Sequence, residues 1–497
     1  MTHHDAILIG AGHNSLVAAA YLAKAGKKVI VLERRDLPGG TLAGEDFEDT
    51  AFDPVWPGGQ LRPDIVKDLK LTPPRAAERT SFTSLLGQND SLTLAPDSSK
   101  AGEAIARFSQ RDAARWPEFV RFIETCARIL DTAYHTRMPR LPKHFNLAEG
   151  YGLLELGLEL RLAGRKDMLH FIRALPMTVQ ELLDEYFESD ALKGALASLA
   201  IHGQTLGPWS AGTGYTFIHN WLNRGGLSHP QTQAGDLAAT LAAAAKKFGA
   251  EIRTGSEVTR ILVDNYACKG VILASGEELH ARAVLSGVDP KRTLLGLVGA
   301  ASLPPEFIWK VQSIKMRGSV AKIHLFTDGS HGLPHGTLVV APTTKYLEQA
   351  YDAAKYGEIS ARPYLEATTC GRVVSIHFQS APYDLKDATW NLKRGALEAL
   401  AINALAEHAP NLKSSIKKQK SITPLDLESI YGLTEGDLNH GQLLLDQFLF
   451  MRPMPGWSNH KTPIDHLYLC GSGVHGGGGV SGAAGRNAAQ VAKANAL

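Results

Sequence analysis

A glycine-rich turn near the start of the chain has the residue types and spacing that bind a dinucleotide. It follows the apolar run 5–9 and opens the segment 14–25, which has the pattern of a helix. The residues of the turn are Gly10, Gly12, His13, Asn14 and Ser15. Small residues at a strand-to-helix turn let a pyrophosphate approach the N–H groups of the helix N-terminus. Ser15 stands where the pattern has its third glycine.

An acidic residue completes the pattern. Glu33 closes the second apolar run, 28–32, where a carboxylate can bind the hydroxyls of a ribose. A carboxylate there disfavours a 2′-phosphate, and therefore NADP. The turn and Glu33 together predict a dinucleotide site. The alternative is an ordinary strand, turn and helix that bind nothing.

A second glycine-dense turn lies between the apolar run 467–470 and the helical segment 483–494. It includes Gly471, Ser472, His475, Gly479, Val480 and Ser481. Residues 471–476 repeat the dinucleotide pattern, but no strand and ribose acid follow them. We therefore expect no second nucleotide site here.

These segments resemble a known family. Residues 10–26 and 31–40 are similar to the FAD motif of phytoene-desaturase-like flavoproteins, and residues 467–489 are similar to the C-terminal FAD signature of that family. The pair His13-Asn14 and several motifs between 423 and 458 resemble one subgroup, the pyridine nucleotide-disulfide oxidoreductase domain-containing protein 2 subgroup. There are two departures: Ser15 replaces the usual glycine, and Gly287-Val288 replaces the more usual Asn-Ala.

The resemblance implies FAD as cofactor and no metal. It adds Arg34, the close turn at Gly39-Gly40 and the strand at Val258, near the adenine half of FAD, to the expected contacts. The expected cofactor-binding set is Gly10, Gly12, His13, Asn14, Ser15, Glu33, Arg34, Gly39, Gly40, Val258, Gly471, Ser472, Gly479, Val480 and Ser481.

Three residues are candidates for catalysis. His475 lies in the turn expected at the isoalloxazine ring, where it could donate to a substrate carbonyl, take a proton or tune the flavin. His440 and Tyr431 lie in the loop before the last strand, although ordinary core or surface roles are the alternative. We expect Glu33→Ala to weaken FAD retention and His475→Ala to lower turnover. His202, Trp209 and Tyr215 come from a stretch rich in small residues that predicts either a pocket or core packing.

The arrangement of predicted elements favours an α/β fold. We expect a two-part Rossmann-like FAD-binding domain of the amine oxidase and phytoene desaturase type, assembled from residues 1–75, 225–300 and 416–497. Residues 76–224 are expected to form a mainly helical cap, with long helical stretches at 104–130 and 179–199. Residues 301–415 are expected to supply the mixed sheet and helix of a substrate domain.

Composition excludes several classes of function. The 52 Lys and Arg against 50 Asp and Glu leave a charge of +2 without a basic arm, so we expect no nucleic-acid partner. The four cysteines form no Cys-x-x-Cys pair, which disfavours disulfide chemistry and metal binding. No signal peptide or apolar span of 18 residues is visible, which predicts a cytoplasmic protein. The helix 153–162 could touch a membrane, pack in the core or form a homodimer contact.

The resemblance implies a desaturase or dehydrogenase that moves hydride from an apolar or cyclic substrate to flavin and forms a carbon-carbon double bond. Oxygen or a quinone-like acceptor would reoxidise the flavin. Two alternatives stay open: a redox-neutral isomerase of polyene double bonds, and a non-catalytic relative that binds a lipid or a prenylated protein.

Overall fold

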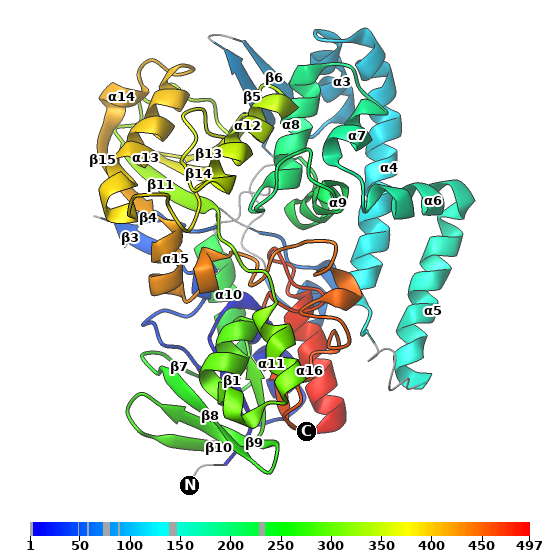
Figure 1. Cartoon of the computed structure of the whole chain (residues 1–497), viewed down its shortest axis with the longest axis vertical. Helices are drawn as coiled ribbons and strands as arrows, with labels where there is room; N and C mark the ends of the chain where they lie inside the picture. The colour runs from blue at the N-terminus through cyan, green and yellow to red at the C-terminus, as the bar shows by residue number, and fades with distance from the viewer. Residues whose placement is uncertain are drawn as a thin grey trace.

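Two large sheets and a helical lobe make up most of the described part of the molecule (Figure 1). The computed structural model describes residues 3–47, 49–56, 59–72, 80–87, 90–138, 147–227 and 234–497, without the side chains of residues 147–151.

The first sheet has the strand order β7-β2-β1-β10-β9-β8, with β16 beside β10. Its strands are β1 (His4–Ile9), β2 (Val29–Leu32), β7 (Glu251–Arg253), β8 (Val258–Asp264), β9 (Ala267–Leu273), β10 (Glu278–Ser286) and β16 (Leu467–Leu469). β7, β2, β1, β10 and β16 are parallel to their neighbours in this set, whereas β9 is antiparallel to both β8 and β10. Every residue of β2 is buried, as expected for a parallel strand covered on both faces.

Helices cover both faces of this sheet. On one side, α1 (His13–Lys24), α10 (Ala234–Lys247) and α16 (Ala483–Asn495) share a hydrophobic core with β1 and β2. On the other side, the π-helix η2 (Arg292–Gly299) and α11 (Pro305–Gln312) pack against Ile7 and Ile30. The result is the doubly wound fold that the sequence predicts.

The second sheet has the strand order β15-β11-β14-β13-β12-β5-β6. Its strands are β5 (Phe82–Gly87), β6 (Asp90–Leu94), β11 (Val320–Thr327), β12 (Thr337–Val340), β13 (Leu365–Cys370), β14 (Val373–Gln379) and β15 (Ile416–Ile422). The sheet is mixed because β12 and β5 are parallel, whereas its other pairs are antiparallel. Helix α13 (Trp390–Ala406) shares a core with this sheet, and α12 (Thr344–Lys355) contacts the helical lobe.

The helical lobe consists of α3 (Ser98–Ala106), α4 (Gln110–His135), α5 (Leu147–Leu162), α6 (Gly164–Ala174), α7 (Val179–Asp184), α8 (Asp190–Ile201) and α9 (Thr213–Arg224). In Figure 1, α5 and α6 lie on the outer side of α4, away from both sheets. Shorter elements connect the layers: α2 (Pro63–Asp68), α14 (Leu412–Ser415), α15 (Pro424–Tyr431), the hairpin β3 (Glu45–Phe47) with β4 (Thr50–Phe52), and the 3₁₀ turns η1 (Gly40–Leu42), η3 (Ala300–Ser302), η4 (Thr434–Gly436) and η5 (Leu449–Met451).

Two of the helical stretches expected in the cap are each divided into two helices, whereas 153–162 lies within α5. Residues 104–130 belong to α3 and α4, and residues 179–199 belong to α7 and α8. The buried carboxylate of Asp112 accepts the N–H groups of Glu188 and Ser189 at 2.9 and 2.8 Å, which ties the start of α4 to the start of α8. Side-chain caps at both breaks thus replace a continuous helix.

The predicted domain limits differ from the sheets in two places. The limit between residues 75 and 76 falls outside the described residues, but β5 and β6, expected in a mainly helical segment, extend the second sheet. The limit at residue 416 is the first residue of β15, which pairs with β11 in the second sheet rather than with the nucleotide-binding strands. The pairings that place β5 beside β12 and β15 beside β11 join strands far apart in the sequence, and no local pattern indicates such partners.

Candidate cofactor and substrate site

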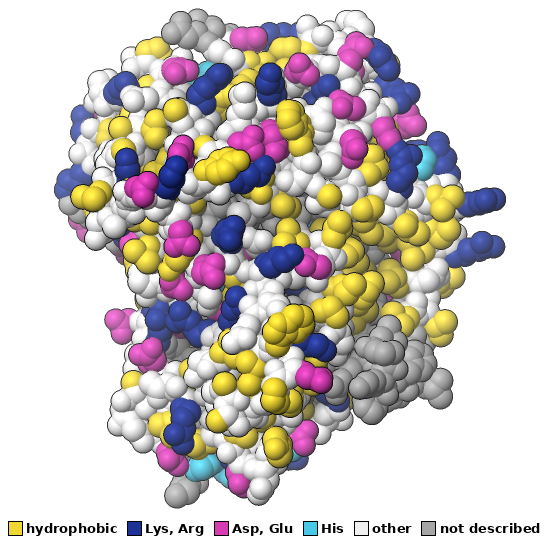
Figure 2. All heavy atoms as spheres, viewed as in Figure 1, with side chains coloured by type: hydrophobic (Ala, Val, Ile, Leu, Met, Phe, Trp, Pro, Cys, Tyr) yellow, Lys and Arg dark blue, Asp and Glu magenta, His cyan; other side chains and the backbone are white. Residues whose placement is uncertain are grey.

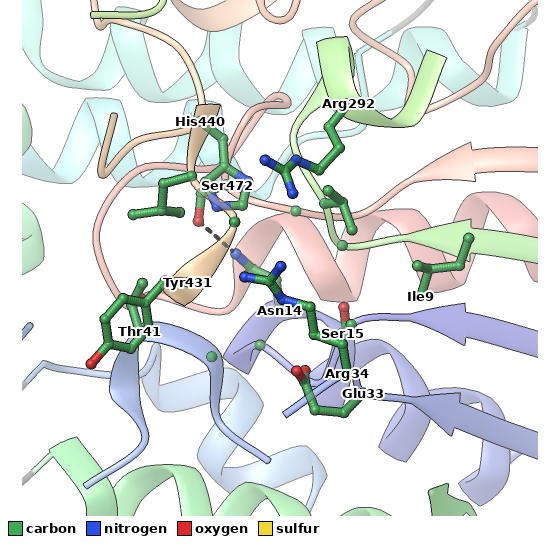
Figure 3. A pocket seen from close by; sticks show the side chains of 18 of the residues that line it. Ile9, Asn14, Ser15, Glu33, Arg34, Thr41, Arg292, Tyr431, His440 and Ser472 are labelled. Atoms are coloured by element: carbon green, nitrogen blue, oxygen red, sulfur yellow. Dashed lines mark hydrogen bonds between the residues drawn. The ribbon is translucent and has the colours of Figure 1, made fainter. Parts of the chain in front are cut away.

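A cavity of about 430 Å³ lies at the carboxyl ends of the parallel strands of the first sheet. Ile9, Leu32, Gly287 and Gly471, at the ends of β1, β2, β10 and β16, all line it (Figure 3). This is the edge where open α/β sheets bind ligands. Its size is that of a binding site for a small molecule or cofactor.

The first glycine turn lies at the cavity wall. Gly10 has a φ of 82°, a conformation that favours glycine. Gly12 has an ordinary φ of −65° as the residue before α1, and a Cβ added to it would meet no protein atom within 4 Å. The protein itself therefore does not require glycine at residue 12, whereas a ligand lying against the turn would. The N-terminus of α1 has no side-chain cap, so its N–H groups can bind an anion.

Glu33 follows β2 and is buried beside the turn. Its two carboxylate oxygens accept N–H groups from Ala11 at 2.7 Å and from Arg35 at 3.0 Å. A carboxylate can accept further hydrogen bonds, and Glu33 lines the cavity, so ribose hydroxyls can still bind there.

Arg34 and Tyr431 both line the cavity, and hydrogen bonds to neighbouring residues fix their side chains. Arg34 donates to the carbonyls of Ser429 and Ile430 at 3.1 and 2.6 Å. The Tyr431 hydroxyl donates to Glu45 at 3.0 Å, and the Arg35 guanidinium lies 4.6 Å from the centre of the Tyr431 ring. Burial raises the pKa of Tyr431 further above neutrality, so its hydroxyl stays protonated. Tyr431 thus lies in the cavity wall with its hydroxyl bonded to Glu45, and its catalytic role stays a prediction.

The two glycine turns, at opposite ends of the sequence, are joined directly. The side-chain amide of Asn14 donates to the Ser472 hydroxyl at 3.3 Å, the contact drawn as a dashed line in Figure 3. Its carbonyl oxygen accepts the N–H of Gly485 in α16 at 3.3 Å. Asn14 therefore fixes both turns in one site.

The two departures from the family pattern face each other. A Cβ added at Gly287 would lie 1.9 Å from the hydroxyl oxygen of Ser15. A serine at residue 15 thus fits because residue 287 has no side chain. An asparagine at residue 287 would require the smaller glycine at residue 15.

Two buried histidines contribute to the cavity. Burial lowers the pKa of His13 to about 4 and also lowers the pKa of His440, so both rings are neutral at pH 7. His440 Nδ1 has no hydrogen-bond partner among the described residues. Figure 3 shows Arg292 across from His440. Arg292 begins the π-helix η2, an element often found at functional sites, and no sequence signal distinguished it from an ordinary helix.

Most of the expected cofactor contacts line the cavity. They are Gly10, Gly12, His13, Asn14, Ser15, Glu33, Arg34, Gly40, Val258, Gly471, Ser472 and Gly479. Gly39 supports the turn from behind, because its N–H donates to the carbonyl of Ala11 at 2.9 Å and a Cβ there would lie 2.7 Å from Ala238. Ser481 accepts the N–H of Ala483 at 3.3 Å and so serves the start of α16.

His475 requires a correction. Its ring is fully buried, and its Nε2 lies 3.0 Å from the carbonyl oxygens of both Ala133 and Thr136 at the end of α4. The ring donates to these carbonyls and is not among the residues that line the cavity. The structure therefore favours a structural role for His475. The glycine-rich turn carries no periodicity from which the direction of this side chain could be predicted.

A smaller cavity of about 30 Å³ adjoins the first and shares Trp56 and Gly479 with it. Val480, expected at the cofactor, lines this smaller cavity, as do His202 and Arg224 from the helical lobe. Of the other residues considered with His202, Tyr215 is buried and bonded to Tyr134 at 2.8 Å, and Trp209 is 51% exposed.

Other chemistries have little support in the described part of the chain. No group of three or more His, Cys, Asp or Glu side chains there is placed to hold a metal ion. Burial raises the pKa of the Cys470 thiol, beside Ser15, to about 12, so it is not a thiolate at neutral pH. Among the described helices, none has the length and apolar character needed to span a membrane.

Fold and cavity define a Rossmann-like α/β protein with the fold of amine oxidases and phytoene desaturases. Residues 8–56 match the family model "NAD(P)-binding Rossmann-like domain". A relative in Rattus norvegicus, pyridine nucleotide-disulfide oxidoreductase domain-containing protein 2, is 32% identical over 98% of this chain and 93% of its own length. The chain belongs to that family.

More distant proteins share the same architecture. A phytoene desaturase (lycopene-forming) of Pseudescherichia vulneris is 24% identical, over 96% of both chains. The solved structure of cyclohexylamine oxidase from Brevibacterium oxydans covers 99% of both chains with a TM-score of 0.57 and 16% identity, which shows a common fold. These comparisons confirm the fold class and the family predicted from the sequence.

Proposed function

We propose that this protein is an FAD-dependent desaturase or dehydrogenase that acts on an apolar or cyclic substrate. The observation that carries the proposal is the joining of both glycine turns around one cavity, through Asn14 and Ser472. The family relationship supports oxidoreductase activity.

The residues present fit FAD. At one end of the cavity, Glu33 and Val258 suit the ribose and adenine, and the uncapped N-terminus of α1 beyond Gly12 suits the pyrophosphate. At the other end, Ser472 and Gly479 suit the ring system, because glycine leaves room for flat rings against the backbone. When bound, FAD supplies a hydride acceptor, so a substrate that also loses a proton from the neighbouring carbon gains a carbon-carbon double bond.

The protein supplies binding, orientation and a place for the proton. In the neutral ring of His440, Nδ1 has no hydrogen-bond partner among the described residues, so it can accept a proton or orient a substrate group. Arg292 provides a fixed positive charge in the same wall. Oxygen or a quinone-like compound is the proposed electron acceptor.

The first experiment is an absorption spectrum of the purified protein, with the Glu33→Ala variant beside it. We expect visible flavin bands in the wild type and weaker FAD retention in the variant, which has lost the ribose-binding carboxylate. A wild-type protein that fails to bind added FAD would contradict the proposal and favour the non-catalytic lipid or prenyl-protein binder. Substrate turnover by reduced enzyme under anaerobic conditions, without consumption of an acceptor, would favour the redox-neutral isomerase.

The proposal includes peripheral contact with an anionic lipid surface through α5 and α6. Leu154 and Leu162 are each 72% exposed, and Leu158, Leu169 and Ile172 are at least half exposed. Figure 2 shows hydrophobic side chains gathered over these helices. The exposed cations at the junction of the two helices are Arg161, Arg165 and Lys166. Exposed apolar side chains with Lys and Arg nearby are typical of binding at an anionic membrane surface.

Sedimentation with vesicles tests this contact. We expect binding to vesicles that contain phosphatidylserine and a reduction when Leu158 and Leu162 are changed to serine. The matched control is Leu392→Ser, an exposed leucine on α13. Concentration-dependent dimerisation that these substitutions abolish, without vesicle binding, would assign the surface to a homodimer instead.

A further inference from the structure

The helical lobe places a polar cluster at the end of the smaller cavity. α9 contributes Asn220, Asn223 and Arg224, which share one helical face, and the C-terminal end of α8 contributes His202. Beneath them lies Glu366 of β13, only 2% exposed. A cavity intended only for hydrocarbon would be lined by apolar side chains.

Arg224 carries unused hydrogen-bonding capacity. Its side chain is 8% exposed, and its Nη2 donates to both oxygens of Glu366 at 2.8 Å. The other two nitrogens, Nε and Nη1, are buried and have no hydrogen-bond partner among the described residues. Buried donors without partners are costly and rare, so these two N–H groups require an acceptor that the described residues do not supply.

The cluster behind Arg224 fixes its position. His202 stacks on His377 with ring centres 4.0 Å apart and lies 3.4 Å from Glu366. His377 donates from Nε2 to Gln379 at 2.8 Å and therefore accepts from Lys322 through Nδ1 at 2.9 Å. The groups around Arg224 are thus packed and bonded, which holds its free N–H groups in place.

The size of the cavity limits what can bind. About 30 Å³ is room for roughly two water-sized groups. The cavity therefore has room only for the end of a substrate, while the adjoining space beside Trp56 and Gly479 has room for a larger part. The charge of Arg224 is matched by Glu366, so the site suits either a neutral or an anionic oxygen.

We propose that this cavity binds the sp² oxygen of a carbonyl or carboxylate group at one end of the substrate, through the free N–H groups of Arg224. This inference rests on the proposed function, because it makes the smaller cavity the substrate end of the flavin site. It names an oxygenated substrate class in place of a pure hydrocarbon. Hydrogen bonds to a carbonyl oxygen also make the adjacent C–H bond more acidic, which assists the loss of a proton.

Three probes of similar shape test the proposal: acetophenone for the carbonyl, benzoate for the carboxylate and toluene for neither. Binding is measured from the rise of the thermal unfolding temperature with probe concentration, in protein with and without FAD. We expect acetophenone or benzoate to bind at least ten-fold more tightly than toluene in FAD-loaded protein, and their order identifies the preferred group. Equal binding of all three would overturn the proposal.

Variants of Arg224 provide the second measurement. Arg224→Lys keeps a positive charge beside Glu366 but removes the free guanidinium N–H groups. We expect it to lose the preference for oxygen while toluene binding stays unchanged. The control is Arg260→Lys, an exposed position on β8. An oxygen preference that survives in folded Arg224→Lys would overturn the assignment. Absence of flavin bands after FAD is added would instead refute the proposed function, and the FAD-free titration would still test the cavity.

Discussion

Gly12→Ala separates the needs of the fold from those of the cofactor. The backbone at residue 12 has φ −65° and ψ 162°, a conformation that alanine adopts readily. The new Cβ would meet no protein atom within 4 Å. Replacing glycine at a compatible position stabilises a protein by about 0.4–1 kcal/mol through the unfolded state. The cofactor-free variant should therefore be as stable as the wild type or slightly more stable.

FAD binding should change in the opposite direction. A methyl group between the pyrophosphate and the start of α1 overfills a close contact, and overpacking costs about 1–3 kcal/mol. That cost corresponds to a dissociation constant roughly 5–150-fold weaker. Titration of the cofactor-free protein with FAD, followed by quenching of flavin fluorescence, measures this change, and urea unfolding measures stability.

Gly26→Ala is the matched control at the other end of α1. Gly26 has a φ of 79° and also has free space around its Cβ position, so alanine there is strained but touches neither protein nor cofactor. We expect a loss of about 1–2 kcal/mol of stability with FAD affinity unchanged. Wild-type FAD affinity in Gly12→Ala, or destabilisation equal to that of Gly26→Ala, would refute the assignment of the turn to the cofactor.

Three further outcomes are expected. His475→Ala should cost about 1–3 kcal/mol in urea unfolding, because the carbonyl of Thr136 loses this donor and the carbonyl of Ala133 keeps only the N–H of Thr136. It should leave FAD binding and turnover intact; lost turnover at unchanged stability would restore its catalytic role. Gly287→Ala should lower the free energy of unfolding, because the new Cβ collides with the Ser15 hydroxyl, and adding Ser15→Gly should recover most of that stability. Additive effects of the two substitutions on stability would contradict this pairing. Burial lowers the pKa of Lys322 to about 7, so between about pH 7 and 10 the unfolded chain binds one more proton than the folded protein. The free energy of unfolding should therefore rise with pH, by up to about 1.4 kcal/mol per pH unit more than in Lys322→Met. Parallel curves of unfolding free energy for the two proteins from pH 7.5 to 9.5 would refute this.

Local sequence patterns predicted the elements that build the cofactor site. The first strand, helix and second strand were predicted because their apolar spacing and bounding glycines are local signals, and Glu33 lies at the cavity as expected. The second glycine turn was predicted from its resemblance to a family signature. Asn14 joins the two turns by a contact that the spacing alone does not reveal.

The remaining features depend on tertiary packing. β5 reaches the second sheet by pairing with β12, more than 250 residues later, and neither segment indicates its partner. His475 was expected at the flavin but turns to the end of α4, since a glycine turn does not fix the direction of a side chain. No sequence pattern singled out Arg292, and the cluster around Arg224 joins α9 to residues of β11, β13 and β14, which lie much later in the sequence. Charged side chains on a helix are usually solvated, and only the fold shows which of them are buried.

The contact between Asn14 and Ser472 spans 458 positions of the chain, and this separation sets the order of events during synthesis. At about 5–20 residues per second, a ribosome takes roughly 20–90 s to proceed from the first turn to the second. Throughout that time the first strand, the first helix and Glu33 can take their places, but the part of the cavity wall that we propose for the flavin rings has not yet been synthesised. Tight retention of flavin would then act as a checkpoint on biosynthesis, because a chain that stops before the second turn lacks Gly471, Ser472 and Gly479 of the cavity wall.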